Sequence, residues 1–159
     1  MHNVNSSIFW PAFNSLEWLS QSNKARLLQW KAYIDLTMYA SRSAPELHLN
    51  EITDYVPASQ SPNQTSWDGV FQRLYQYSLD GKDDGHAVKL GRAVKNAEQV
   101  SRGFEAREGF RVEGGMWGKI ANMVIDSVED SGETWIRGAG FDEAWENFGE
   151  RKRKGGASL

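Results

Sequence analysis

The feature that most constrains this fold is a helical periodicity of apolar side chains, which is clearest over residues 115–130. At about 100° per residue, apolar residues of this stretch fill one broad arc of a helix and polar residues fill the other. The apolar arc contains Met116, Trp117, Ile120, Ala121, Met123, Val124, Ile125 and Val128. No convincing strand pattern accompanies it. We therefore predict an all-α fold, an irregular array of about five to six helices without a significant sheet.

Turn and capping residues divide the rest of the chain into further helices. Ser22 or Asn23 is predicted to cap one helix, Ser66 a second, and Asp83 or Asp84 to start a third. Residues 41–66, rich in Ser, Pro, Asn and Gln, are predicted to form a connector that holds only a short helical turn. The expected helices cover residues 11–19, 22–39, 67–77, 83–104 and 115–130, with a short helical turn over residues 51–55 and a last short helix over residues 141–148 as an addition.

The expected helix over residues 22–39 is apolar on nearly all sides. Leu27, Ile34 and Met38 share one stripe, while Trp30 and Tyr33 fill much of the remaining surface. A helix that is apolar all round is normally enclosed by other elements. We therefore predict that this helix is buried.

Length and composition indicate one globular domain. The chain has 159 residues, of which 40% are hydrophobic and 12% aromatic, including seven Trp. This is enough for one sizeable core. We predict a single helical domain over residues 1–148, followed by a disordered basic tail over residues 149–159.

Several functional classes are disfavoured by charge and residue usage. The net charge is -3 without a basic stripe, so nucleic acid is not expected as a partner. Cysteine is absent, which excludes disulfides and thiolate chemistry. No apolar run reaches the ~18 residues of a membrane span, and no signal peptide is visible, so we expect a cytoplasmic protein without a membrane partner.

His86 is the most interesting titratable residue. It is expected in the first turn of a helix, on the apolar stripe, with Asp83 and Asp84 close by. The positive end of the helix dipole favours the neutral ring, which can accept a proton or orient a substrate. The alternative is a hydrogen-bonded histidine that only helps to start a helix.

Other candidate residues also have structural interpretations. Lys31 and Asp35, spaced i,i+4, form either an acid/base pair in a pocket or a structural ion pair. Asn122 and Asp126, one helical turn apart on the polar arc, either hold a substrate oxygen or belong to a solvated face. Trp30 and Trp117 either stack on a flat aromatic ligand or belong to the core.

No cofactor or metal motif is present. The chain has no Gly-x-Gly-x-x-Gly and no Gly-x-x-x-x-Gly-Lys-Ser/Thr sequence, so no dinucleotide fold is expected. The three histidines are scattered and do not give a metal-binding spacing.

Six stretches of the chain form an ordered set: NKARLLQWK from residue 23, DLTMYASR from 35, DDGHAVKL from 83, GMW from 115, NMVIDSV from 122 and WIRGAGFDEAW from 135. In their order and spacing they resemble the C-terminal part of the questin oxidase-like proteins of fungal secondary metabolism. The resemblance spans about residues 2–148 and implies oxidoreductase activity. Family members resemble Baeyer–Villiger oxidases that act on aromatic polyketide ketones with O₂ and NADPH, without a conventional flavin motif.

This resemblance implies roles for the candidate residues. His86 and Asp126 are the expected catalytic residues, which transfer protons to the peroxide or carbonyl oxygen. Lys31, Asp35, Asn122, Trp30 and Trp117 are expected to bind the substrate.

The family's members are much longer than this chain, so the resemblance does not say whether the chain acts alone or together with a further portion. Either the chain is a truncated product, or it is a subunit that associates with itself or with the missing N-terminal portion. The polar arc with Asn122 and Asp126 is then expected to face the missing portion. The alternative function is a non-catalytic helical interaction or accessory module, for which an exposed apolar patch over residues 6–19 or 27–39 is expected.

Overall fold

The structure is a computed structural model that describes residues 1–129 and 135–149. Over these ranges the regular structure is helical and contains no strand, which confirms the all-α prediction. Contacts along the chain define two compact units. Unit 1 comprises Met1–Leu47 and Ile136–Gly149, and unit 2 includes His48–Trp135. The single-domain assignment stays a prediction, and the basic tail lies outside the described residues apart from Gly149.

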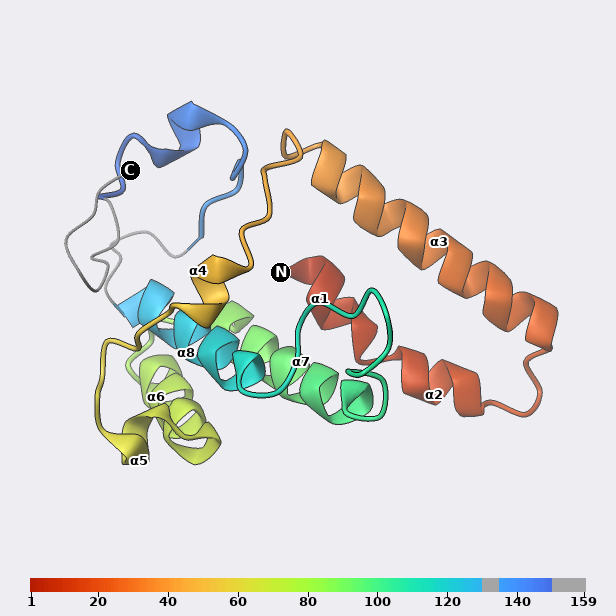
Figure 1. Cartoon of the computed structure of the whole chain (residues 1–159), viewed down its shortest axis with the longest axis horizontal. Helices are drawn as coiled ribbons and strands as arrows, with labels where there is room; N and C mark the ends of the chain where they lie inside the picture. Colours follow the sequence, from red (N-terminus) through yellow and green to blue (C-terminus); the bar gives the residue numbers. More distant parts are fainter. Residues whose placement is uncertain (130–134, 150–159) are drawn as a thin grey trace. The chain divides into compact units, whose positions relative to one another are not determined.

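Unit 2 is built on three packed helices, α6 (Trp67–Leu79), α7 (His86–Ser101) and α8 (Met116–Glu129), which lie side by side in Figure 1. Two short helices, α4 (Asn50–Thr53) and α5 (Pro62–Thr65), pack on α8 and α6 respectively. The Ser66 hydroxyl accepts a hydrogen bond from the Gly69 amide at 3.2 Å, so the expected cap of α6 is confirmed.

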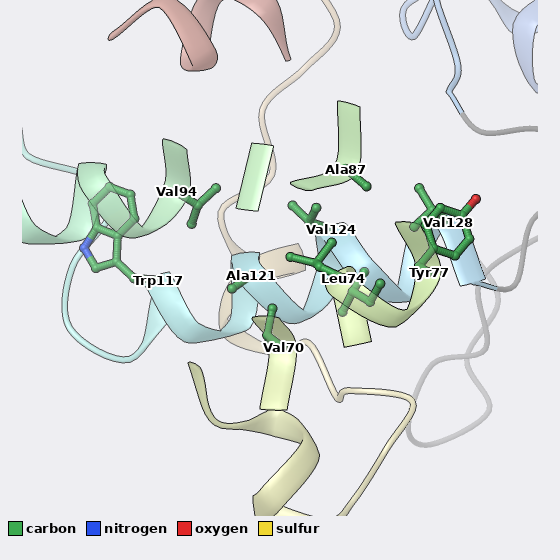
Figure 2. Close-up of a cluster of buried hydrophobic side chains, with 10 residues drawn as sticks. Val70, Leu74, Tyr77, Ala87, Val94, Trp117, Ala121, Val124 and Val128 are labelled. Atoms are coloured by element: carbon green, nitrogen blue, oxygen red, sulfur yellow. The ribbon is translucent and has the colours of Figure 1, made fainter. Parts of the chain in front are cut away.

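The core of unit 2 forms where the apolar stripes of these three helices meet (Figure 2). Each stripe repeats every three or four residues, so its members share one face of their helix. Burial of each large aliphatic side chain contributes about 1.5–3 kcal/mol. The contributing residues are Val70, Leu74 and Tyr77 from α6, Ala87 and Val94 from α7, and Trp117, Ala121, Val124, Ile125 and Val128 from α8.

The first turn of α6 approaches the chain around α5 so closely that only glycine fits. A Cβ atom at Gly69 would lie 2.0 Å from the backbone carbonyl oxygen of Asn63. Because that neighbour is backbone, no side chain can move aside. We expect Gly69→Ala to destabilise the protein by about 1–3 kcal/mol in urea unfolding. The matched variant Gly118→Ala in α8 has open space around its Cβ and should be neutral or stabilising by up to about 1 kcal/mol. Equal unfolding midpoints for the two variants would contradict this reading of the contact.

Several helix boundaries differ from the sequence prediction. α7 begins at His86, because the Asp83 carboxylate accepts hydrogen bonds from the amides of Ala87 and Val88 at 3.0 and 3.2 Å and caps the helix from outside. It ends at Ser101 instead of residue 104. The expected helix over residues 51–55 is the shorter α4, and the one over residues 141–148 is a single 3-10 turn, η1 (Asp142–Trp145).

Unit 1 contains α1 (His2–Ser7), α2 (Trp10–Ser15), α3 (Gln21–Ala40) and η1. Pro11 lies in the first turn of α2, but this helix is shorter than the expected one over residues 11–19 and ends at Ser15, because Leu16 adopts an extended backbone conformation. The cap of α3 is Ser20, whose hydroxyl accepts from the Asn23 amide at 3.3 Å, and neither Ser22 nor Asn23 takes this role.

The prediction that α3 is buried is wrong for this structure. α3 is a single long helix (Figure 1), and none of its residues is buried. Leu36, for example, leaves 64% of its surface exposed. The sequence pattern gave the apolar character of the helix correctly, but unit 1 provides no core around it. No helix of the described residues is long and apolar enough to cross a bilayer.

Candidate functional site

A buried polar cluster surrounds Asp126 on α8. Asp126 is 7% exposed and Asn122, one turn earlier, is 2% exposed. Of the two alternatives for these residues, the solvated face is therefore wrong. The connector after α4 covers this side of α8, since Tyr55 and the amide of Ala58 both donate hydrogen bonds to Asp126.

Three donors converge on the two carboxylate oxygens of Asp126. Nη2 of Arg73, from α6, donates to Oδ1 at 2.5 Å. The Tyr55 hydroxyl and the Ala58 amide, the latter at 2.9 Å, donate to Oδ2. The cluster thus joins α6, α8 and the connector through one carboxylate, whose oxygens are largely occupied by these bonds.

Arg73 is shared between two carboxylates. Its Nε donates to Oε1 of Glu129 at 3.2 Å, and its Nη2 also contacts Glu129 Oε2. Burial alone would lower the pKa of the guanidinium, but the hydrogen bonds that it donates to Glu129 and Asp126 outweigh burial and raise the pKa above its usual range. Arg73 is therefore a fixed positive charge in the cluster.

Two buried polar atoms of this region have no hydrogen-bond partner among the described residues. One is Nη1 of Arg73, a donor, and the other is Oδ1 of Asn122, an acceptor. The Asn122 amide nitrogen is satisfied, because it donates to the carbonyls of Thr65 and Gly118 at 2.9 and 2.8 Å. Buried groups without partners cost about 1–3 kcal/mol each, so these two atoms have spare capacity for a ligand oxygen, amide or hydroxyl.

His86 forms a second polar feature at the start of α7. Its Nδ1 lies 2.5 Å from Oδ1 of Asp84, as the sequence suggested for one of the two aspartates. With a carboxylate partner at Nδ1, that nitrogen is the proton donor, and proton exchange by the ring would go through Nε2. The imidazole is partly exposed, so its prediction as an inward-facing residue holds only in part.

The hydrogen bond from His86 holds the pKa of Asp84 below its ordinary value. A carboxyl whose pKa is lowered by folding adds stability above its unfolded pKa of about 3.9, and this stability disappears as the pH falls through the folded pKa. We expect His86→Gln to raise the Asp84 pKa toward its usual range, measured by ¹³C NMR titration of the side-chain carboxyl. The unfolding free energy of the His86→Gln variant should also fall less steeply than that of the wild type when the pH is lowered below about 4. An unchanged Asp84 titration would show that the histidine contact is unimportant.

The other predicted site residues lie apart from these features. Trp117 belongs to the core of unit 2, and its indole nitrogen donates to Oε1 of Glu105 at 2.9 Å. Lys31 and Asp35 form an ion pair on α3 in unit 1, as their spacing suggested, and Trp30 on the same helix is more than half exposed. The described residues contain no group of three or more His, Asp or Glu side chains able to hold a metal ion.

Comparison with known proteins shows to which family the chain belongs. Residues 1–94 match the family model described as questin oxidase-like. The chain belongs to the questin oxidase-like family. It is 39% identical over 150 residues to Baeyer-Villiger oxidase ptaJ of Pestalotiopsis fici, which covers 91% of this chain. It is 38% identical to the questin oxidase of Aspergillus fumigatus over 150 residues, again 91% of this chain. Identity to Baeyer-Villiger monooxygenase AacuH of Aspergillus aculeatus is 38% over 152 residues, or 92% of this chain.

The chain spans about a third of the length of these relatives: the matches cover 32%, 32% and 30% of the ptaJ, A. fumigatus and A. aculeatus proteins. The expectation that the Asn122 and Asp126 arc faces the rest of the family architecture is not supported, because the connector already covers it. In this questin oxidase-like chain, α3 is one of the segments that expose large apolar side chains.

Sequence reasoning missed two members of the buried cluster, Tyr55 and Arg73. A weak signal existed for Arg73, which lies beside the stripe of Val70, Leu74 and Tyr77 on the helical wheel of α6. Its partner Asp126 lies on the polar arc of α8, so the helical wheels did not predict that the two residues pair. No comparable signal marked Tyr55, because it lies in an irregular connector.

Proposed function

We propose that this chain contributes to an oxidoreductase of fungal secondary metabolism that oxidises an aromatic polyketide ketone in a Baeyer–Villiger reaction. The observation that carries this proposal is identity of 38–39% over 91% of the chain to relatives named as Baeyer-Villiger and questin oxidases. One atom of O₂ enters the carbon–carbon bond beside the carbonyl and gives an ester or lactone. The other atom leaves as water, with two electrons and a proton from NADPH and a second proton from solvent.

The described residues do not form a recognisable NADPH site. They contain no strand, and the chain has no glycine-rich phosphate cradle of the dinucleotide-binding type. We therefore give no described residue a role in holding NADPH. This leaves proton transfer and substrate orientation as the tasks for residues of this chain.

His86 is proposed as the proton-transfer group. Asp84 holds its Nδ1, which fixes the ring and directs proton exchange to Nε2. The reaction needs a proton donor when the peroxide O–O bond breaks, and a partly exposed imidazole with a carboxylate partner meets this need. Asp126 was expected to share this role, but its three donors favour a positioning role instead.

Arg73 and Asn122 are proposed to bind substrate oxygens. Asp126 and Glu129 fix the guanidinium, while its Nη1 has spare donor capacity. A fixed cation can stabilise the negative charge that develops on the carbonyl oxygen when the peroxide adds to it. Roles for Lys31, Asp35, Trp30 and Trp117 in substrate binding stay predictions.

The test is an oxygen-transfer assay with an anthraquinone, NADPH and ¹⁸O₂, followed by mass spectrometry of the product. It should be run on the chain alone and on the chain co-expressed with the remaining part of the A. fumigatus questin oxidase. We expect incorporation of one labelled oxygen atom, and a loss of about 10²–10⁴-fold in His86→Gln. His48→Gln is the matched control and should retain activity. Absence of label under both conditions would overturn the proposal.

A second candidate function, a non-catalytic interaction module, is favoured by the exposed apolar residues of α3. Such a module would bind a partner through this helix and give no labelled product in the same assay. Stable binding together with complete absence of oxygen transfer would therefore select this second function.

A further inference from the structure

On α3 the apolar side chains are the more exposed ones, and most of the charged side chains are partly covered. The half-covered face of the helix carries Lys24, Leu27, Lys31, Asp35 and Met38, three of which are charged. The exposed apolar and aromatic side chains of the helix are Leu28, Trp30, Tyr33, Ile34, Leu36 and Tyr39. Ile34 shares the stripe of Leu27 and Met38, and the other five point away from it. A helix on the surface of a water-soluble protein normally has the opposite arrangement.

The charged residues of α3 are also arranged so that other elements could bury the helix. From Leu27 to Ala40 the only charged residues are Lys31 and Asp35, and these pair with each other through Nζ and Oδ2. Ionised side chains are seldom fully enclosed unless they are paired. The last fourteen residues of this helix therefore present no unpaired charge to a neighbour.

The exposed apolar side chains cover too much of the helix for one partner helix. At 3.6 residues per turn they are spread over roughly two thirds of the circumference. Two packed helices cover each other along only one face. Within unit 1, no other helix packs along α3, so at least two more elements are needed to enclose it.

We propose that α3 is the central helix of a bundle that is completed by the part of the questin oxidase-like architecture lying outside the stretch matched by this chain. The matched stretch is about a third of the relatives' length, so the remaining part is large enough to supply several helices. α3 lies within residues 1–94, which match the family model. The occupant is an apolar helical region, on the same polypeptide or on a separate one. This inference depends on family membership and not on the oxidase reaction.

The test is co-expression of the tagged full chain with the region of the A. fumigatus questin oxidase that does not align with this chain. We expect a one-to-one complex by affinity capture and light scattering, with slowed hydrogen exchange across α3. Tyr33→Glu places a charge on the proposed interface and should reduce capture by about tenfold or more. Tyr75→Glu on α6 is the matched control, because Tyr75 is 63% exposed and Tyr33 is 55% exposed, and it should capture as well as the wild type.

Each other outcome overturns the proposal. Failure of capture, or equal loss in both variants, would exclude the family region as the occupant of α3. A homodimer of the chain with α3 protected would assign the surface to a second copy. A monomer with α3 already protected would show that the chain covers its own helix. All readouts are binding and exchange, so absence of oxygen transfer would not affect them.

Discussion

Asp126→Ala is expected to lower the free energy of unfolding by about 3–5 kcal/mol, measured by urea denaturation followed by circular dichroism. The substitution leaves the Arg73 guanidinium largely enclosed with one carboxylate fewer, and it leaves the Tyr55 hydroxyl and the Ala58 amide without their acceptor. The cost is large because a charge and two polar donors lose their partner in one change.

Glu129→Ala is the appropriate control for this variant. Glu129 also pairs with Arg73, but its side chain is much more exposed, so we expect a loss of only about 0–1 kcal/mol. The double variant Asp126→Ala, Arg73→Ala should cost less than the sum of the two single variants, because the unpaired cation is removed as well. A loss below about 1 kcal/mol in Asp126→Ala would show that the cluster is not a structural tie.

Leu74→Ala should destabilise the protein by about 2–5 kcal/mol. Leu74 is 1% exposed and lies at the contact of α6 with α7, where a Cβ on Gly91 would come within 2.5 Å of its Cδ1 atom. Truncation therefore removes buried apolar surface and leaves a cavity beside a closely packed backbone. The change is measured by thermal and urea unfolding of the full chain.

Leu79→Ala provides a control on the same helix with the same chemical change. Leu79 is 61% exposed, so its truncation should alter the unfolding free energy by less than about 0.5 kcal/mol. Similar losses in the two variants would contradict the placement of the core of unit 2.

The sequence predicted helix starts and buried helix faces correctly where they depend on residues close together in the chain. Ser66 precedes an apolar period and has a free hydroxyl, which is sufficient to locate the start of α6. The arc around Ile125 likewise predicted the face of α8 that is buried in the core. These features depend on residues within one or two turns of each other, so sequence alone contains them.

The candidate site depends on contacts that a helical wheel cannot represent. Asp126 has its partners Tyr55 and Ala58 at separations of 71 and 68 residues, in a connector without regular structure. On the wheel, Asp126 belongs to the polar arc, and it is covered by this connector together with Arg73 of α6. The same limit applies to α3, where the apolar character of the helix predicted burial but the structure leaves every residue of the helix at least partly exposed.

The hydrogen bonds from Tyr55 and Ala58 to Asp126 also determine how the connector before α6 can move. A surface loop ordinarily opens at little energetic cost, independently of the helices that it joins. This loop can lift away only if a carboxylate shared with Arg73 gives up two of its donors. Opening of the loop therefore costs two hydrogen bonds to a buried carboxylate, and a protease that requires an extended segment here would cut at a rate limited by that cost.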